Sequence, residues 1–382
     1  RSALLHVLRT DDADVILETN GTSAISLVRN MIDIDDGEEI LTTNEEGNVV
    51  LPALFGRDPW NYPSMFEENV GLFTNHKPNP IDHSAREGTS VCTVKMLGEN
   101  DDRKTNTQIL KEIEESLQYR QVRLVMIPQV TKTGRVLPVR EIGEVIKNIN
   151  KRAGRQIIYI VDGVQALGRT DAESLYKPLE YCDFYIATSS KALGGILIAA
   201  GIVAKPETLR DNLPSLLNSA YAHHLRHYQF PEEGYPDIEN FLSQNNEHQA
   251  ISLPEIGSFS YVLEDFYNRG EGKSFGERRN LQLRRIQKIR EKVVERLSSI
   301  KGIRIYEGNC DIPIVPSIIA FTHNDISAKE IKKMLQDPQL GPVVALSANV
   351  GRVMRLEIPE YRSVPNIDTL IEKMRSATGD QL

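Results

Sequence analysis

The segment QIIYIVD (156–162) ends in an acid and continues directly into GVQALGR (163–169). Its first part combines β-branched and aromatic side chains, which predicts a strand buried on both faces. Its second part brings glycine and other small residues, which favour a turn. A charged side chain, Asp162, therefore stands at the carboxyl end of a predicted buried strand.

Similar strands lie on either side of this one along the chain. VRLVMIP (122–128) and CDFYIATS (182–189) are apolar strands, and apolar spacing predicts helices at 107–119 and 137–154. Apolar strands that alternate with helices form mainly parallel sheets covered by helices on both faces. The sequence thus predicts an α/β fold with such a sheet.

Two charged residues follow strands of this sheet. Asp162 ends one strand, and Lys191 lies just after another, in ATSSKALGG (187–195). Open parallel sheets bind ligands beyond the carboxyl ends of their strands. The two residues therefore indicate a ligand site at this edge.

Composition limits the class of protein. The chain has 382 residues with 40% hydrophobic and 26% charged residues, as in a soluble globular protein with a large core. A net charge of −8 gives no basic surface for nucleic acid. The longest apolar run (196–204) is shorter than the ~20 residues of a membrane helix. Three cysteines without short spacing fit a reducing, cytoplasmic location.

The pattern of the chain changes in its last third. A long charged helix at 275–300 precedes short strands and a last helix near 367–376. We predict a large domain (1–255) and a smaller α+β C-terminal domain (256–382) that includes the connecting helix. The first residue is Arg1, not Met, so we expect a processed or partial chain whose N-terminal part is short or missing.

The residues at the strand ends suit one cofactor, pyridoxal 5′-phosphate (PLP). A lysine at a strand end among small residues can lose its proton and form an imine, as Lys191 would with the PLP aldehyde. The ring nitrogen needs an acidic partner, and Asp162 is the candidate. Gln165 is three residues further on and is the candidate for the phenolic oxygen.

The PLP phosphate needs N–H groups at a helix N-terminus and nearby hydroxyls. ETNGTSAISLVRNMI (18–32) offers a turn followed by a helical pattern. The candidate phosphate ligands are Gly21, Thr22, Ser23, Thr188 and Ser190. Each element has an ordinary alternative, since NGTS can be only an N-cap and a Ser-Lys pair is usually surface. Their joint occurrence at strand-to-loop junctions favours the cofactor site.

Three of these motifs resemble one family in sequence and order. GTS (21–23), DGVQALG (162–168) and SSKALGG (189–195) are similar to the phosphate turn, aspartate and lysine segments of the class V aminotransferase group of fold-type I PLP enzymes. That group includes cysteine desulfurases and isopenicillin-N-epimerase-like proteins. The resemblance implies an aspartate-aminotransferase-like fold and PLP as cofactor. It also implies a homodimer, because the group builds each active site from two subunits.

The resemblance also implies roles for single residues. Lys191 would be the Schiff-base lysine and move the proton at the substrate α-carbon. Asp162 would pair with the pyridine nitrogen, and Gln165 with the ring O3′. Arg355 would hold the substrate carboxylate through its bidentate fork, although outside this context it would be taken for a surface ion pair.

The sequence departs from the family pattern in three places. Segment 41–52 lacks the aromatic or histidine ring that many members stack on the cofactor. Either Glu45 covers the cofactor, another segment does so, or the match to the family is shifted by a residue here. Segment 344–354 lacks the nucleophilic cysteine of desulfurases, and Cys310 precedes the wrong strand. The leading segment is shorter than in relatives. Separately, His223, His224 and His227 have no carboxylate or cysteine partner at a suitable spacing, so no metal site is predicted.

We therefore predict a PLP-dependent enzyme that acts on a small α-amino acid. Transamination, or a lyase reaction that cleaves a C–S bond by β-elimination, fits a desulfurase-like set of residues that lacks the nucleophilic cysteine. A persulfide-forming desulfurase reaction does not fit it. An amino-acid epimerase and a non-catalytic, cofactor-binding member of the same fold remain alternatives. A nicotinamide dehydrogenase is disfavoured because no G-x-G-x-x-G follows a strand.

Overall fold

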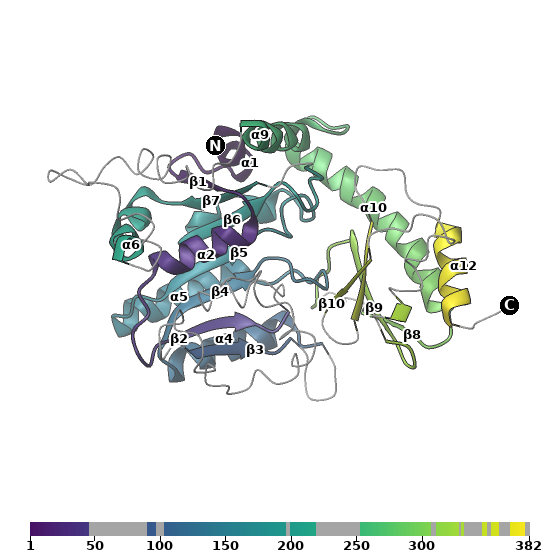
Figure 1. Ribbon diagram of the computed structural model, residues 1–382, viewed down its shortest axis with the longest axis horizontal. Coiled ribbons are helices and arrows are strands. Elements are labelled where there is room, and N and C mark those ends of the chain that lie inside the picture. Colours follow the sequence, from purple (N-terminus) through teal and green to yellow (C-terminus); the bar gives the residue numbers. More distant parts are fainter. Residues whose placement is uncertain are drawn as a thin grey trace.

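The computed structural model describes residues 1–45, 90–96, 103–195, 199–218, 253–306, 311–327, 330–331, 346–349, 353–358 and 367–378. These residues form two sheets with separate helical covers (Figure 1). No helix in the described part of the chain is both long and apolar enough to cross a membrane.

The large sheet is mostly parallel, as predicted. Its order is β1-β7-β6-β5-β4-β2-β3, and β7 alone runs antiparallel to its two neighbours. The short connection from β6 to β7 accounts for this, because a parallel return needs a longer crossover. The strands are β1 (Asp14–Glu18), β2 (Glu39–Thr43), β3 (Ser90–Val94), β4 (Val122–Pro128), β5 (Ile158–Asp162), β6 (Phe184–Thr188) and β7 (Ala200–Ala204).

Helices cover both faces of this sheet, which is why its central strands are apolar throughout. Alternate residues of β5 belong to two different cores, with Ile160 on one face and Val161 on the other. The helices on the Ile160 face are α2 (Gly21–Met31) and α6 (Pro206–Asn218). Those on the Val161 face are α1 (Ser2–Leu8), α4 (Asn106–Tyr119), α5 (Val139–Ala153) and α9 (Leu253–Asn268).

Local signals fix the helix ends close to where the sequence predicts them. Thr105 and Gln108 form a reciprocal capping box at the start of α4. Pro138 precedes the first turn of α5, and Gly154 ends that helix at φ 62°. A glycine adopts this left-handed conformation without steric cost.

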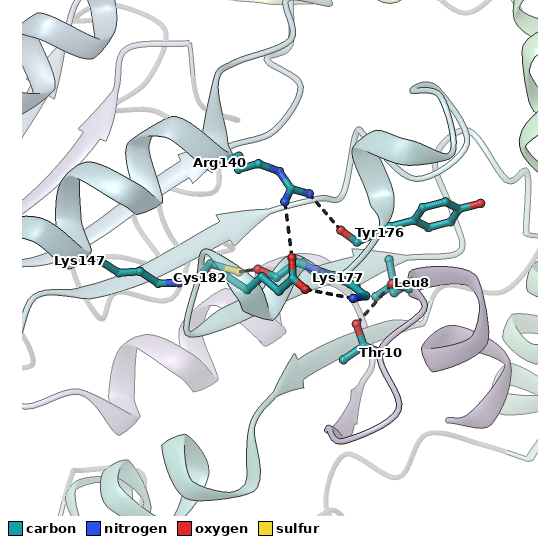
Figure 2. Close-up of polar contacts among 9 residues, drawn as sticks. Leu8, Thr10, Arg140, Lys147, Tyr176, Lys177 and Cys182 are labelled. Atoms are coloured by element: carbon teal, nitrogen blue, oxygen red, sulfur yellow. Dashed lines mark hydrogen bonds and ion pairs between the residues drawn. The ribbon is translucent and has the colours of Figure 1, made fainter.

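The connection from β5 to β6 is anchored on α5 through two short turns, η2 (Glu173–Leu175) and η3 (Pro178–Glu180). Figure 2 shows Arg140 and Lys147 of α5 directed at this connection. The Glu180 carboxylate lies 3.6 Å from Arg140 and 3.2 Å from Lys177, and Lys147 donates to the Glu180 carbonyl. Lys177 N–H donates to Leu8 O at 2.7 Å. These contacts fix where β6 begins and therefore where its far end lies.

The second sheet is antiparallel and has the order β10-β11-β9-β8. Figure 1 shows α10 running beside it toward α12. Ile286, Phe321, Met354 and Met374 are part of its apolar core. Its elements are α10 (Phe275–Ser298), β8 (Ile303–Ile305), β9 (Ile318–His323), β10 (Leu346–Asn349), β11 (Val353–Glu357) and α12 (Ile367–Thr378).

We predict that Gly143→Ala destabilises the protein. A Cβ at position 143 of α5 would overlap the backbone oxygen of Tyr181, which cannot rotate away. We expect a loss of about 1–3 kcal/mol in the free energy of unfolding, measured by denaturant titration. The control is Gly257→Ala in α9, where nothing lies within 4 Å of a new Cβ. That change removes a flexible helical glycine and should stabilise by roughly 0.5–1 kcal/mol. Equal effects of the two substitutions would contradict the packing.

Candidate functional site

The carboxyl end of β5 is the centre of the candidate site. Asp162 is level with Pro128 of β4 on one side and with Ile186 of β6 on the other. Thr188 ends β6 and is level with Ala200, which in turn pairs with Glu18 at the end of β1. The register thus brings the ends of β1, β4, β5 and β6 to one edge of the sheet.

Asp162 is a buried carboxyl group. Its side chain is 8% exposed, and its Oδ1 accepts the Val164 N–H at 2.8 Å. Desolvation raises the pKa of Asp162 to about 6, although the Val164 N–H and the charge of Lys191 both oppose that rise. The folded chain therefore disfavours this carboxylate unless a further positive charge is brought near it.

Lys191 lies just beyond β6 and interacts electrostatically with Asp162. Lys191 is exposed as a whole residue, but protein atoms near its amine remove part of the water around that group. Partial desolvation lowers the pKa of Lys191, and the charges of Arg355 and Arg169 lower it further. A larger fraction of this amine is therefore uncharged near neutral pH than in a free lysine, which suits attack on a carbonyl.

The predicted phosphate turn lies next to Asp162. A Cβ on Gly21 would stand 3.0 Å from Val164 Cγ2, so the turn and the loop after β5 pack directly together. Asn20 caps α2 by accepting the Ser23 N–H at 2.9 Å, and Thr19 Oγ1 bonds the Ser23 hydroxyl at 3.3 Å. The helix N-terminus, where Thr22 and Ser23 lie, is at this edge of the sheet.

The two hydroxyls predicted from the lysine segment also lie together. Thr188 Oγ1 is 3.3 Å from Ser190 Oγ and donates to Ala199 O at 2.9 Å. Thr188 is buried, and Ser190 is half-buried. The bond to Ala199, at the start of the return to β7, therefore fixes the Thr188 hydroxyl beside Ser190 and next to Lys191.

Beside Lys191, four polar side chains form a closed ring of hydrogen bonds and ion pairs that joins the loop after β5 to strand β11 of the second sheet. Gln165 Oε1 accepts from Arg355 Nη2 at 3.1 Å and also from Arg169 Nη1. The Glu357 carboxylate bonds Arg169 Nη2 at 2.6 Å through one oxygen and Arg355 Nη2 through the other. Arg169 and Arg355 are 2% and 5% exposed. Burial lowers the pKa of Arg355 to about 10, despite the opposing effect of Glu357.

Sequence reasoning did not single out Arg169 or Glu357. One signal was available for Glu357, because residues two apart on a strand share a face, and Arg355 and Glu357 are two apart on β11. Met354 and Leu356 face the apolar core beside the second sheet, so Arg355 and Glu357 face the opposite way. Arg169 gave no comparable signal, since its partner Glu357 is 188 residues distant in sequence.

A third residue that sequence reasoning passed over is Glu18. It ends β1 at the same edge and is 4% exposed. Burial raises the pKa of Glu18 to about 7, although the Thr19 N–H opposes the rise. The site edge therefore holds two acids with raised pKa values, Asp162 and Glu18.

Glu45 lies at a different part of this edge. Its carboxylate accepts the Thr133 hydroxyl at 2.6 Å, in the turn after β4. Nothing in the structure tests its expected role as a cover of the cofactor ring. His223, His224, His227 and Cys310 lie outside the described residues.

The chemical groups at this edge fit PLP. A buried acid with a raised pKa suits a pyridine nitrogen, and the amine of Lys191 suits an aldehyde. The capped N-terminus of α2, with hydroxyls of Thr188 and Ser190 at the same edge, suits a phosphate. Gln165 contacts Arg169 and Arg355 through Oε1, because a guanidinium has only donors. The amide N–H groups of Gln165 are therefore left to donate to another acceptor, such as a ring oxygen.

Comparisons with known proteins give structural matches alone. No protein-family model matches the chain, and no curated protein does. A cystine C–S lyase, solved with its reaction product cysteine persulfide, matches with a TM-score of 0.66 at 15% identity, over 98% of this chain and 84% of that one. Another structure of that lyase holds glycine covalently linked to PLP.

Two further matches come from named bacteria. Ureidoglycine–glyoxylate aminotransferase from Bacillus subtilis has a TM-score of 0.63 at 14% identity, over 99% of this chain and 83% of that one. A NifS-like protein from Rickettsia africae has a TM-score of 0.61 at 14% identity, over 99% and 86%. These proteins have the class V aminotransferase fold, and this chain has the same fold. The predicted fold-type I architecture is therefore confirmed.

We predict that Asp162→Asn stabilises the cofactor-free protein above pH 6. A pKa raised from 3.8 to about 6 means that the folded state binds the proton more tightly than the unfolded state. Stability therefore falls as pH rises from 4 to 6, by up to about 3 kcal/mol. Urea titrations at pH 4, 6 and 8 should show a smaller loss in the variant than in the wild type.

The control for this measurement is Glu18→Gln. Because the pKa of Glu18 is raised to about 7, its share of the loss extends about one pH unit higher than that of Asp162. A pH dependence of the Asp162→Asn variant that matches wild type at every pH would show that Asp162 is not desolvated as the structure has it.

Proposed function

We propose that this chain is a PLP-dependent enzyme that acts on α-amino acids. The principal support is the position of Asp162 at the end of β5 and of Lys191 just beyond the neighbouring strand β6, at one edge of the sheet. The charge of each also acts on the pKa of the other, although desolvation is the larger effect on both. The fold adds to this, because the similar proteins include an aminotransferase and a PLP-containing C–S lyase.

Each residue has a distinct task in this proposal. PLP, when bound, supplies an electron sink for the charge that develops at the substrate α-carbon. Asp162 keeps the ring nitrogen protonated. Lys191 binds the cofactor aldehyde and then moves the proton at the α-carbon. Arg355 holds the substrate carboxylate, and Gln165 donates to the ring oxygen. The phosphate ligands are Gly21, Thr22, Ser23, Thr188 and Ser190, and Glu45 is the candidate to cover the ring.

The reaction type is a finer proposal. Transamination or C–S cleavage by β-elimination suits a frame with a proton-moving lysine and a carboxylate-binding arginine. The names of the similar aminotransferase and C–S lyase support these two outcomes. A persulfide-forming desulfurase is disfavoured on the sequence, since segment 344–354 holds no cysteine. We further propose a homodimer, to be tested by sedimentation velocity, in which a single monomer peak at every concentration would refute it.

We predict that borohydride reduction of the PLP-loaded protein fixes the cofactor to Lys191. Peptide mapping by mass spectrometry should place the label on the peptide that contains residue 191. Lys191→Ala should lose both the label and the visible absorbance of the bound cofactor. Lys205→Ala is the matched control, because Lys205 follows β7 at the opposite edge of the sheet and should leave both unchanged. A label on another lysine would refute the assignment.

We predict that the loaded protein exchanges the α-proton of its amino-acid substrate with solvent. In D2O, a panel of amino acids and S-conjugates should show deuterium at the α-carbon by mass spectrometry, whichever product follows. Asp162→Asn should slow the exchange at least about 100-fold, and Lys191→Ala should do the same, since each removes an acid–base partner. Keto acid, sulfide or racemised product then identifies the reaction. PLP binding without exchange for any compound would favour the non-catalytic alternative.

A further inference from the structure

The polar ring beside Lys191 leaves one guanidinium group incompletely bonded. Arg355 Nη2 serves both Gln165 and Glu357, whereas Arg355 Nε is buried and has no hydrogen-bond partner among the residues that the structure describes. A buried N–H of an arginine without a partner is costly. The N–H groups of Arg355 Nη2 therefore have partners, whereas the N–H of Nε in the same guanidinium has none among the described residues.

The geometry of a guanidinium determines how a carboxylate can reach Arg355. A carboxylate binds arginine through two parallel N–H···O bonds, either end-on at Nη1 and Nη2 or side-on at Nε and Nη2. Both arrangements use Nη2. That atom already bonds the Glu357 carboxylate. The two N–H groups of Nη2 bond Gln165 and Glu357, so a second carboxylate can bind Arg355 in a bidentate manner only when one of these partners releases Nη2. Glu357 is the partner that carries the same charged group as the incoming carboxylate.

We propose that Glu357 occupies the place of the substrate carboxylate on Arg355 and leaves it when an amino acid binds. This inference rests on the proposed function, because it takes Arg355 as the carboxylate-binding residue. Glu357 is then a specificity-determining residue that competes with the substrate.

Arg169 is the residue that retains Glu357 after this exchange. One oxygen of Glu357 already bonds Arg169 Nη2 at 2.6 Å, so the carboxylate keeps an ion pair when it leaves Arg355. The charges support the exchange as well. Two buried arginines share one carboxylate in the structure, and a substrate carboxylate would bring the set to neutrality. Since unpaired buried charge is costly, the second carboxylate is favoured.

The test uses two small molecules that cannot react, propionate and its neutral isostere propionamide. Their dissociation constants are measured by calorimetry on the wild type, Glu357→Gln and Arg169→Met, each with and without PLP. Glu357→Gln should bind propionate about tenfold more tightly, because a neutral amide competes less well for Arg355. Arg169→Met should bind propionate more weakly, because Glu357 then has Arg355 as its remaining ionic partner in the ring. Propionamide binding should stay the same in all three proteins.

Unchanged or weaker propionate binding in folded Glu357→Gln would overturn the proposal, as would tighter binding in Arg169→Met. The two variants have opposite expected signs, so if one fails to fold by circular dichroism the other still decides. Arg355→Lys should abolish the tight propionate binding, and its persistence would overturn the proposal too. Failure of the proposed function shows separately, as absence of PLP uptake by the wild type.

Discussion

Folding removes a carboxyl group from most of its contact with water, at the carboxyl end of the central strand β5. Burial raises the pKa of Asp162 to about 6, so near neutral pH the folded chain holds an unfavourable negative charge. The pairing of β4, β5 and β6 leaves Asp162 little freedom to move out. A positive charge supplied by a ligand would remove this cost. The buried charge therefore lowers the stability of the cofactor-free protein. A cofactor with a positively charged ring nitrogen near Asp162 would restore that stability when it binds.

Around that acid, the neighbouring charges are mainly positive. Lys191, Arg169 and Arg355 face the site, and Glu357 offsets part of their charge. A site of this kind is complementary to a ligand that carries anionic groups at its ends and a cationic ring nitrogen over Asp162. The phosphate turn adds the N-terminus of α2 at the same edge, where the helix dipole also favours an anion. The charges of the site are therefore complementary to a PLP phosphate at the N-terminus of α2 and to an amino-acid carboxylate at Arg355.

The sequence predicted those parts of the fold whose causes are local. Buried strands such as β5 show as continuous apolar runs, and the helix α5 shows its end through Gly154. The position of Asp162 and Lys191 at one edge of the sheet was predictable, because each follows a buried apolar strand. The contacts of Glu45 with Thr133 and of Arg169 with Glu357 were not, because they join segments 88 and 188 residues apart. The first contact depends on the pairing of β2 with β4 in the large sheet, and the second on where β11 meets the loop after β5. Periodicity encodes neither arrangement.

Gln165 connects the two halves of the candidate site. Its Oε1 accepts from Arg169 of its own loop and from Arg355 of β11, so its amide N–H groups are left to donate elsewhere. When a carboxylate displaces Glu357 from Arg355, the guanidinium that orients Gln165 changes its own partners. Hydrogen bonds in such a network polarise one another, so a change at one arginine reaches the next donor. In the proposed function, occupation of the carboxylate site would in this way be coupled to the hydrogen bond that Gln165 would donate to the ring oxygen.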